Sequence, residues 1–539
     1  MTITRRTLIN SAVATAAAGQ SLLTSRPSSA QTPSGTLRFV PEFDLQVLDP
    51  IANTGLSTLQ HGYLVYDTLF SVDRTYTPRP QMVDKYAVSD DGRTYDFTLR
   101  DGLRFHDGAA VRAQDCVASI RRWGARDVMG RAIMARLDSL VASDEKSFRL
   151  KLKEPYPILI DAFAKVSSNV CFIMREREAS TDPNTLVKDV VGSGPFRFVA
   201  NEFVPGSKVV YARNEAYVPR QEPSDGYSGG KHARVNRVEW NIIGDANTQL
   251  SALIAGEVDL VSGPPLDLLP MLARDRNVVI KHLDQQGWAA YIRPNHIHPP
   301  FNDIRARRAL AHLVDQSDYL NAAAGDKANW TECRAFMVCG SPMESQAGME
   351  AYAKADLVKA KALLAESGYN GEPLVVLDPT DNPILGALSQ ITIGQLRKIG
   401  ANVQPVSTDL ATAFARRASR NAPTAGGWHI FHTRSLGVEL NNPLTSFPLA
   451  SPCSADAQGN RAGWFGWSCD EKLEQLREQW TKAASLDERK KVAVEIQRRA
   501  AEHLPFIPLG QMRTPVAHRA NVRGLIEMPI VVFWNVALG

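Results

Sequence analysis

Basic and aromatic side chains late in the chain have the chemistry to hold a small charged organic molecule. Arg434 could bind a carboxylate through two parallel N–H donors, although an arginine on the surface is the alternative. Trp464-Phe465-Gly466-Trp467 gathers three aromatic rings in a glycine-rich loop, which could form a wall of a ligand site or pack beneath that loop. Arg434, Trp464, Phe465 and Trp467 are therefore candidate ligand contacts.

Two pairs of histidines could contact a metal ion or a metal–chelate complex. His429 and His432 lie three residues apart, and His296 and His298 share one face if that segment is extended. Each pair lacks a third ligand in the sequence, whereas metal sites usually need three or four. We therefore predict no metal site and no cofactor, and keep only His432 as a candidate contact to the ligand.

Motifs for catalysis are weak or missing. Ser143 and Lys146 have the spacing of a serine–lysine pair, but Ser-Asp-Glu-Lys is typical of a hairpin turn and its partner motifs are absent. The glycines around Ser193 do not form a nucleophile elbow, and the sequence has neither a Walker A motif nor His-Glu-x-x-His. The sequence thus predicts a protein that is not an enzyme.

The N-terminus has the features of an export signal. Arg5 and Arg6 precede an alanine-rich apolar run over 11–23, and small residues end the segment at Ala30. Paired arginines favour the twin-arginine route, with an ordinary Sec signal as the alternative. We predict a signal peptide over 1–30, removed near Ala30 and Gln31, and a periplasmic location. No later run is apolar and long enough to span a membrane.

Composition indicates a globular protein with two or three domains. Roughly 500 residues remain after the signal, which is too many for one core. Apolar residues make up 44% and charged residues 22%, and the net charge of +4 is small for this length. Because no dense basic tract accompanies that charge, nucleic-acid binding has little support.

The six cysteines fall into two groups. Two close pairs lie in loops rich in glycine, proline and serine and could be disulfides in an oxidising compartment: Cys333 with Cys339, and Cys453 with Cys469. Cys116 lies on the apolar stripe of an expected helix and Cys171 within an apolar run, so both are expected to be buried thiols.

Helices and strands alternate through much of the chain, as in α/β proteins. Asp470 is an expected helix cap, and Ser485 with Glu488 forms a capping box for the next helix. The other expected elements are strands at 36–40, 95–99, 257–261, 374–377 and 401–406, and helices at 247–255, 356–367 and 388–399.

Several phrases, in order along the chain, carry a resemblance to a known family. Tyr95 to Asp115 contains a strand, two Asp-Gly turns and a helix start; further phrases lie at 252–259, 299–305 and 504–509. Together they resemble the family 5 extracellular solute-binding proteins of ABC importers, which include dipeptide-, oligopeptide- and nickel-binding proteins. The matches run from about residue 36 to about residue 510.

The resemblance implies a bilobal α/β fold of the periplasmic-binding-protein type, with an additional inserted α+β domain. Lobe I would be assembled from 35–72, 191–293 and 505–539, the inserted domain would be 73–190, and lobe II 294–504. Crossings near 293 and 504 would be hinge strands, between which the lobes close on a solute.

The resemblance also implies further ligand contacts. In peptide-binding members a carboxylate four residues before a proline meets the α-ammonium group, and Glu439 falls at that position before Pro443. This sequence departs from the family pattern in two ways: the family usually has Asp where this chain has Glu439, and commonly has Trp where this chain has Leu436. Trp288, just before the expected hinge strand, is another possible wall. Asp49 and Tyr66 follow from the family's use of the first lobe's opening loops.

These patterns predict a monomeric periplasmic subunit that delivers a solute to the transmembrane permease subunits of an ABC importer. The expected cargo is a short peptide or a peptide-like, amino-bearing molecule, whose charge needs a fixed partner once it leaves water. Alternatives are a carrier for a nickel–chelator or other metal–chelator complex or for a non-peptide organic acid, a chemoreceptor-linked sensory binding protein, and an exported hydrolase.

Overall fold

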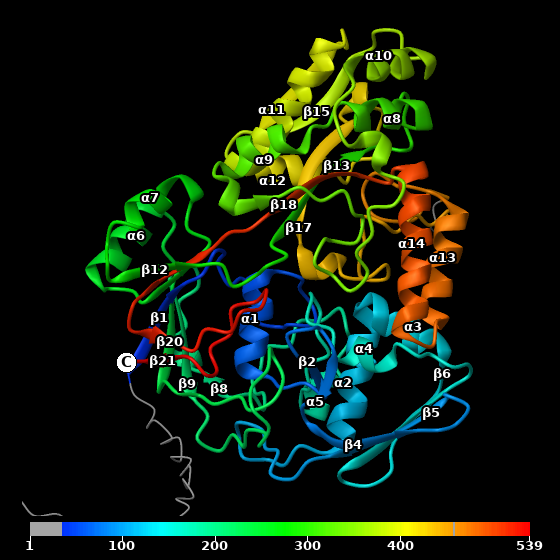
Figure 1. Cartoon of the computed structure of the whole chain (residues 1–539). Coiled ribbons are helices and arrows are strands. Elements are labelled where there is room, and N and C mark those ends of the chain that lie inside the picture. The colour runs from blue at the N-terminus through cyan, green and yellow to red at the C-terminus, as the bar shows by residue number, and fades with distance from the viewer. Residues whose placement is uncertain (1–34, 456–458) are drawn as a thin grey trace, which may run out of the picture. The chain divides into compact units, whose positions relative to one another are not determined.

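Three β-sheets organise residues 35–455 and 459–539, which are the residues that the computed structural model describes (Figure 1). The predicted export signal and its cleavage near Ala30 and Gln31 lie outside the described residues. Within the described ranges, no helix is both long and apolar enough to cross a membrane. The functional geometry therefore follows from the three sheets and the helices that pack on them.

The first sheet has seven strands, and β1 (Thr36–Val40) lies at its centre. Leu37 and Phe39 alternate with less buried residues along β1, as in a strand with one face in the core. β1 runs parallel to both neighbours, and the outer pairs are antiparallel. The strand order is β12 (Val278–Lys281), β19 (Val516–Arg519), β11 (Leu260–Ser262), β1, β10 (Arg237–Asn241), β9 (Lys208–Arg213) and β8 (Phe196–Phe198).

Helices of this part of the chain include α1 (Leu56–Val65), α6 (Ala246–Ala255) and α7 (Leu269–Leu272). The carboxylate of Asp245 accepts a hydrogen bond from the Thr248 N–H at the start of α6, and Gly256 ends that helix with φ of 76°. This left-handed cap, which glycine adopts without a Cβ penalty, confirms the predicted helix stop.

The second sheet has six strands and contains the longest parallel run. β15 is buried along its whole length, as expected of a strand covered on both faces. It runs parallel to β16 and β17, whereas β13 is antiparallel to β17 and β18. The strand order is β14 (Trp330–Thr331), β18 (Ile507–Met512), β13 (Trp288–Pro294), β17 (Ile430–Leu436), β15 (Leu374–Pro379) and β16 (Val403–Thr408).

Helices around the second sheet follow the predicted capping chemistry. Asp470 accepts from the Leu473 N–H at 2.7 Å, and the capping box of Ser485 and Glu488 is present. Figure 1 shows α13 and α14 side by side, next to α3 of the third sheet's region. The helices are α8 (Ile304–His312), α9 (Gln316–Ala324), α10 (Leu357–Glu366), α11 (Pro383–Lys398), α12 (Leu410–Arg416), α13 (Glu471–Lys482) and α14 (Leu486–His503).

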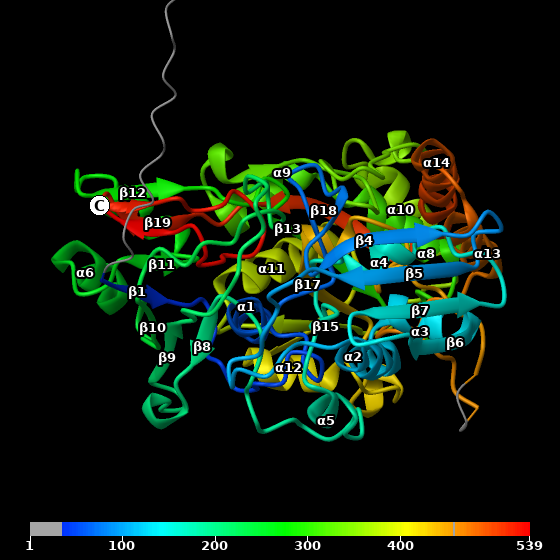
Figure 2. The same ribbon diagram turned by 90° about the horizontal axis from the view of Figure 1, so that it is seen from below.

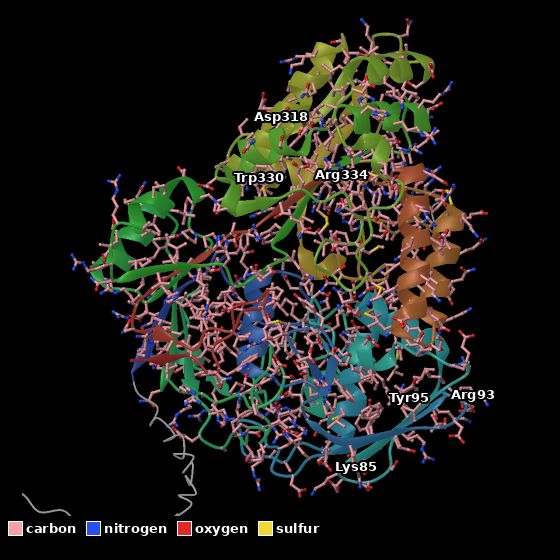
Figure 3. All side chains as sticks on the ribbon, in the orientation of Figure 1. Lys85, Arg93, Tyr95, Asp318, Trp330 and Arg334 are labelled. Carbon is pink, nitrogen blue, oxygen red and sulfur yellow. A yellow bond between two sulfur atoms is a disulfide. The ribbon has the colours of Figure 1, made fainter. Side chains whose placement is uncertain are left out.

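The third sheet is antiparallel and lies within the region expected to be an inserted domain. Its order is β4 (Val83–Val88), β5 (Thr94–Leu99), β7 (Ser147–Leu152) and β6 (Leu137–Ala142). Its helices are α2 (Ala113–Arg126), α3 (Val128–Arg136), α4 (Leu159–Phe163) and α5 (Glu176–Ala179). Figure 2 shows β4, β5 and β7 side by side with α2 next to them. Figure 3 shows Lys85, Arg93 and Tyr95 of the first hairpin far from Asp318 and Trp330 around the second sheet. Two small hairpins, β2 (Phe70–Val72) with β3 (Pro78–Pro80) and β20 (Val522–Arg523) with β21 (Ala537–Leu538), complete the strands.

Two connections carry the chain between the first and second sheets. After β12 the chain passes through 282–287 into β13, and after β18 it returns through 513–515 into β19. Both β13 and β18 therefore pair in the second sheet, although they were expected to stand at the crossings near 293 and 504. These two α/β sheets, with the antiparallel sheet beside them, form the bilobal arrangement with an added α+β part.

Glycines before β8 permit a close approach of two backbones. A Cβ added to Gly192 would lie 2.0 Å from the Val65 carbonyl oxygen, and one added to Gly194 would lie 2.7 Å from the Leu64 oxygen. Larger residues would push the end of α1 away from β8. The sharp bend predicted at this point is thus explained by packing against the end of α1. The start of the same helix lines the cavity described below.

Both disulfides join the pairs that the sequence suggested. Cys333 is bonded to Cys339 and Cys453 to Cys469, whereas Cys116 and Cys171 are free and buried. The cysteines of the first disulfide are 6 positions apart in the sequence, and those of the second are 16 positions apart. The second loop contains the aromatic segment 464–467, so the disulfide restrains those rings.

Removing the longer loop's disulfide is expected to destabilise the protein more than removing the shorter one. A disulfide that closes a loop of about 15 residues lowers the entropy of the unfolded chain and so stabilises the folded protein by about 3 kcal/mol. Shorter loops contribute less. We expect Cys453→Ser/Cys469→Ser to lower the thermal midpoint more than Cys333→Ser/Cys339→Ser, as measured by calorimetry without reductant. The reverse order would contradict this explanation from loop length.

Candidate ligand-binding site

A large cavity lies where the parts of the fold meet. Its volume is about 800 Å³, within the range of about 300–1,000 Å³ that is common for small-molecule sites. Its walls come from the loop after β1 and the start of α1 (residues 43–58), from residues 126–131 and 165–169 beside α3 and α4, and from strands and loops of the second sheet. Ligands in this cavity would contact both α/β parts of the molecule at once.

Four of the residues singled out from the sequence line this cavity: Trp288, Arg434, Glu439 and Trp464. The remaining five candidates, which are Asp49, Tyr66, His432, Phe465 and Trp467, are not among the lining residues. Trp288 and Arg434 come from adjacent strands, β13 and β17, while Glu439 follows the end of β17. Strand pairing thus brings together side chains that are up to 151 positions apart, the separation between residues 288 and 439.

Glu439 is positioned by the way β17 ends. Gly437 donates its N–H to the Gly287 carbonyl at 2.7 Å, and a Cβ at this glycine would lie 2.6 Å from the Gln286 Cβ. Only a glycine permits this close approach to the 282–287 connection. The chain then forms a short 3-10 turn, Gly437–Leu440, which directs Glu439 to the cavity wall.

The carboxylate of Glu439 is half-buried, and its direct side-chain partner is a hydroxyl. Its Oε1 accepts a hydrogen bond from the Ser168 Oγ at 2.7 Å, and within the described residues it has no ion pair inside 4.0 Å. Burial raises the pKa of Glu439 above its ordinary value, while the Ser168 hydrogen bond and the charge of Lys165 act in the opposite direction. A ligand that brings a cation would compensate this half-buried acid.

Affinity for an amino-bearing ligand is therefore expected to depend on pH through Glu439. The ionised carboxylate is the binding form, so affinity is full above the raised pKa and falls as pH drops through it. The amino group of a peptide, with a pKa near about 8, stays protonated throughout this range. We expect calorimetric affinity to decline as the pH falls through the raised pKa of Glu439, at a higher pH than an ordinary glutamate would give. A flat profile would argue against Glu439 as the partner.

Arg434 is balanced by a residue from the other sheet. Its guanidinium lies 3.2 Å from Glu42, in the loop after β1, and 4.1 Å from the centre of the Trp288 ring. Burial raises the pKa of Glu42, and the charge of Arg434 opposes that shift. Arg434 Nη1 nevertheless has no hydrogen-bond acceptor. This ion pair joins the two α/β parts at the cavity, and Nη1 is one unused donor beside it.

Aromatic rings form a second wall around Trp464. Its ring lies 5.1 Å from Phe447 and 5.7 Å from Phe431, and the Arg293 guanidinium lies 5.2 Å from its centre. Phe465 and Trp467 support this wall from behind instead of lining it. Trp467 is buried against Trp428, and the Phe465 carbonyl accepts a hydrogen bond from Arg293 at 2.6 Å.

Asp49 and Tyr66 are built into the protein interior. Asp49 Oδ2 lies 2.7 Å from Arg122, and neither side chain is exposed to solvent. Tyr66 is also buried, where it ends α1 and packs its ring near Phe172. The first lobe does contribute to the cavity, but through residues 43–58 and not through these two side chains.

Each of the four histidines considered as metal contacts forms a hydrogen bond within the protein. His432 is buried, and its Nε2 lies 2.7 Å from Thr392 Oγ1; burial lowers its pKa to about 3. His429 accepts from the Val375 N–H and donates to the Pro299 carbonyl, both at 2.9 Å. His296 and His298 contact backbone carbonyls. No cluster of three or more candidate metal ligands occurs in residues 35–455 and 459–539.

A serine, a histidine and an aspartate meet elsewhere in a triad-like arrangement. Ser468 Oγ lies 2.9 Å from His503 Nε2, and His503 Nδ1 lies 3.3 Å from Asp470 Oδ2. However, Ser468 is buried, bonded also to Ser451, and is not part of the cavity wall. A nucleophile needs access to substrate, so this group links α13, α14 and the disulfide loop and has no catalytic geometry.

Among the polar residues of the cavity that the sequence did not single out are Asp44, Ser168 and Arg417. Asp44 Oδ1 is buried without a hydrogen-bond partner. Ser168 meets Glu439 only through long-range folding, and no local pattern marks it. Arg417 follows Arg416 at the end of α12, where basic residues commonly favour the helix dipole, so its sequence context gave no reason to single it out.

Two α/β parts around one organic-sized cavity define a bilobal solute-binding protein. Comparisons with solved structures support this fold. The structure matches that of the binding protein AgaA in complex with agropinic acid from A. tumefacien, with a TM-score of 0.74, 23% identity and coverage of 94% of this chain and 99% of that one. It also matches a dipeptide-binding protein from pseudoalteromonas in complex with Met-Leu, with a TM-score of 0.75, 19% identity and coverage of 94% and 100%. These matches confirm the predicted fold class.

The chain belongs to the bacterial extracellular solute-binding proteins, family 5, whose model matches residues 77–454. It is also 38% identical over 538 residues to the probable peptide ABC transporter periplasmic-binding protein y4tO of Sinorhizobium fredii, covering 99% of each chain. This confirms the family indicated by the sequence phrases. Members of this class bind solutes and do not convert them, so the prediction of a non-enzyme is also confirmed.

Proposed function

We propose that this chain is the periplasmic substrate-binding subunit of an ABC importer for short peptides or peptide-like, amino-bearing compounds. It captures the solute in the cavity between its two α/β parts and delivers it to transmembrane permease subunits. The mature protein begins near Gln31, after export by the twin-arginine route, and acts as a monomer. Glu439 binds the ligand's ammonium group, and Trp288, Arg434 and Trp464 contact the remainder.

The observation that carries this proposal is the state of Glu439. Glu439 is a half-buried carboxylate whose direct partner is a hydroxyl and whose pKa is raised by desolvation, so a cation supplied by the ligand would stabilise its ionised form. An ammonium group with three N–H donors can bind Glu439 and still leave Ser168 as a hydrogen-bond donor. The aromatic walls at Trp288 and Trp464 suit the uncharged part of an organic ligand.

Relatives supply support for a peptide ligand. The Sinorhizobium fredii protein is named as a peptide transporter component, and the pseudoalteromonas protein was solved with a dipeptide. The AgaA complex with agropinic acid supports the alternative of a non-peptide organic acid. A nickel–chelator complex would have to bind without a three-residue metal cluster among the described residues, because none occurs there.

Closure of the two parts on the ligand follows from the two connections between the sheets. We propose that 282–287 and 513–515 act as the hinge. Lobe I would consist of 35–72, 191–293 and 505–539, and lobe II of 294–504. The exceptions are β13 and β18, which pair in the second sheet and would move with lobe II. The inserted domain is 73–190. The Glu42–Arg434 pair and the Ser168–Glu439 hydrogen bond span the cavity, so they would form on closure and break on opening.

The experiment that tests the proposed function is a thermal-shift screen of the mature protein. The panel contains di- and tripeptides, amino acids, opine-like and aromatic acids, sugars, and nickel with and without chelators. A ligand at 100-fold excess over its Kd adds about 2.7 kcal/mol to the free energy of unfolding. Stabilisation by peptides supports the proposal. Stabilisation only by a metal complex or by acids without an amino group would overturn it.

A further inference from the structure

Arg417 differs from the other basic side chains of the cavity because its guanidinium has neither a hydrogen-bond acceptor nor an ion pair among the described residues. Five of the six donate hydrogen bonds or form ion pairs: Arg126 with Asn184, Arg131 with the Arg126 carbonyl, Lys165 with Asp127, Arg434 with Glu42, and Arg477 with Glu474. Among the residues that the structure describes, the guanidinium of Arg417 has neither an ion pair nor a hydrogen-bond acceptor, and its Nε is buried.

The surroundings of Arg417 hold it in place without neutralising it. Its guanidinium lies 4.0 Å from the centre of the Phe414 ring and 4.7 Å from that of Phe465. Its backbone is fixed as well, because its N–H ends α12 at Ala413 and its carbonyl accepts from Trp428 Nε1 at 3.0 Å. Aromatic faces stabilise a cation and leave its N–H edge free for an anion.

Burial lowers the pKa of Arg417, and the charge of Tyr291 opposes that shift. Tyr291, Glu439 and Arg417 all line the same cavity. A ligand that carries an ammonium and a carboxylate could therefore meet opposite charges in one cavity, at Glu439 and at Arg417. Neither charge needs another protein residue for compensation.

We propose that Arg417 is the residue that binds a carboxylate of the ligand, through two parallel hydrogen bonds from its guanidinium. Arg434 is the other candidate, but Glu42 already balances its charge. This inference rests on the proposed function for its choice of a zwitterionic, peptide-like ligand. The carboxylate can be the C-terminus of a short peptide or the acid group of another organic ligand, and both sources bind the same guanidinium.

The test is calorimetry with defined pools of di- and tripeptides, each prepared as the free acid and as the C-terminal amide. We expect the wild-type protein to bind the free acids more than tenfold tighter than the amides, because an amide leaves Arg417 without its counter-charge. Arg417→Gln should bind acid and amide equally, and Arg417→Lys should retain part of the preference. Arg397→Gln, on the exposed side of α11, is the matched control and should behave as wild type.

Each outcome decides the inference separately from the proposed function. If peptides bind but Arg417→Gln keeps the preference for the free acid, or Arg434→Gln removes it instead, the assignment to Arg417 is overturned and the peptide carrier stands. If no peptide binds, opine-like and aromatic acids are titrated next. Binding of such an acid that is lost in Arg417→Gln supports Arg417 while the peptide proposal fails. If no carboxylate-bearing compound binds, both are overturned.

Discussion

Asp49→Asn is expected to destabilise the protein by about 3–5 kcal/mol while leaving ligand affinity unchanged. The substitution removes the counter-charge of Arg122, whose side chain is fully buried. Four carbonyl or hydroxyl acceptors from residues 181–185 would remain around Arg122, but none of them carries a negative charge. Asp49 also accepts from the Val187 N–H through Oδ2 and from the Ile51 N–H through Oδ1, and asparagine would keep only one of these two acceptor oxygens.

Urea or thermal unfolding gives the stability effect, and calorimetry well below the thermal midpoint gives the affinity. Asp90→Asn is the control, because Asp90 is an exposed turn acid of the first hairpin and should change neither quantity. The resemblance to family members implied instead that Asp49 contacts the ligand. Loss of affinity with unchanged stability would restore that role and contradict the buried ion pair.

Glu439→Gln is expected to weaken binding of an amino-bearing ligand by more than tenfold, which is more than about 1.4 kcal/mol. An amide cannot neutralise the ammonium, which is then buried without a partner; such losses commonly cost about 2–5 kcal/mol. Folding should change little, because the wild-type carboxylate has a hydroxyl and no basic partner to lose. Isothermal titration of wild-type and variant protein measures the difference.

Asp44→Asn is the matched control for Glu439→Gln. Asp44 lines the same cavity and also has a buried oxygen without a hydrogen-bond partner. If Asp44→Asn removes binding and Glu439→Gln does not, the ammonium group lies at the loop after β1 and the proposed orientation of the ligand is wrong. Unchanged affinity in both variants would indicate a ligand without a cationic group.

Local chemistry accounts for the elements that the sequence predicted well. The capping box of Ser485 and Glu488, the cap of Asp470 and the glycine stop at Gly256 are all present, since each depends on residues within one helical turn. The start of α11 was placed at residue 388 but lies at Pro383, because Asn382 caps a first turn that adds little to the apolar pattern. The strand near 504–509 begins three residues later, at Ile507, after Leu504 ends α14.

The site was only partly accessible from the sequence. Trp288, Arg434, Glu439 and Trp464 line the cavity, and all of them lie in or next to β13, β17 and the aromatic loop. The partners that decide their electrostatic state lie far away in sequence: Ser168 is 271 residues from Glu439, and Glu42 is 392 residues from Arg434. Such pairs form only when the sheets and the inserted part come together, so no local pattern could predict them.

The central claim is that an ammonium group is captured at Glu439 inside the cavity. Its most direct test is isothermal titration of the unmodified mature protein with a peptide that stabilises it, and with the same peptide acetylated at its N-terminus. Acetylation removes the positive charge and keeps the remainder of the peptide. The account predicts that the acetylated peptide binds more than tenfold weaker. Equal affinity for the two forms would contradict it.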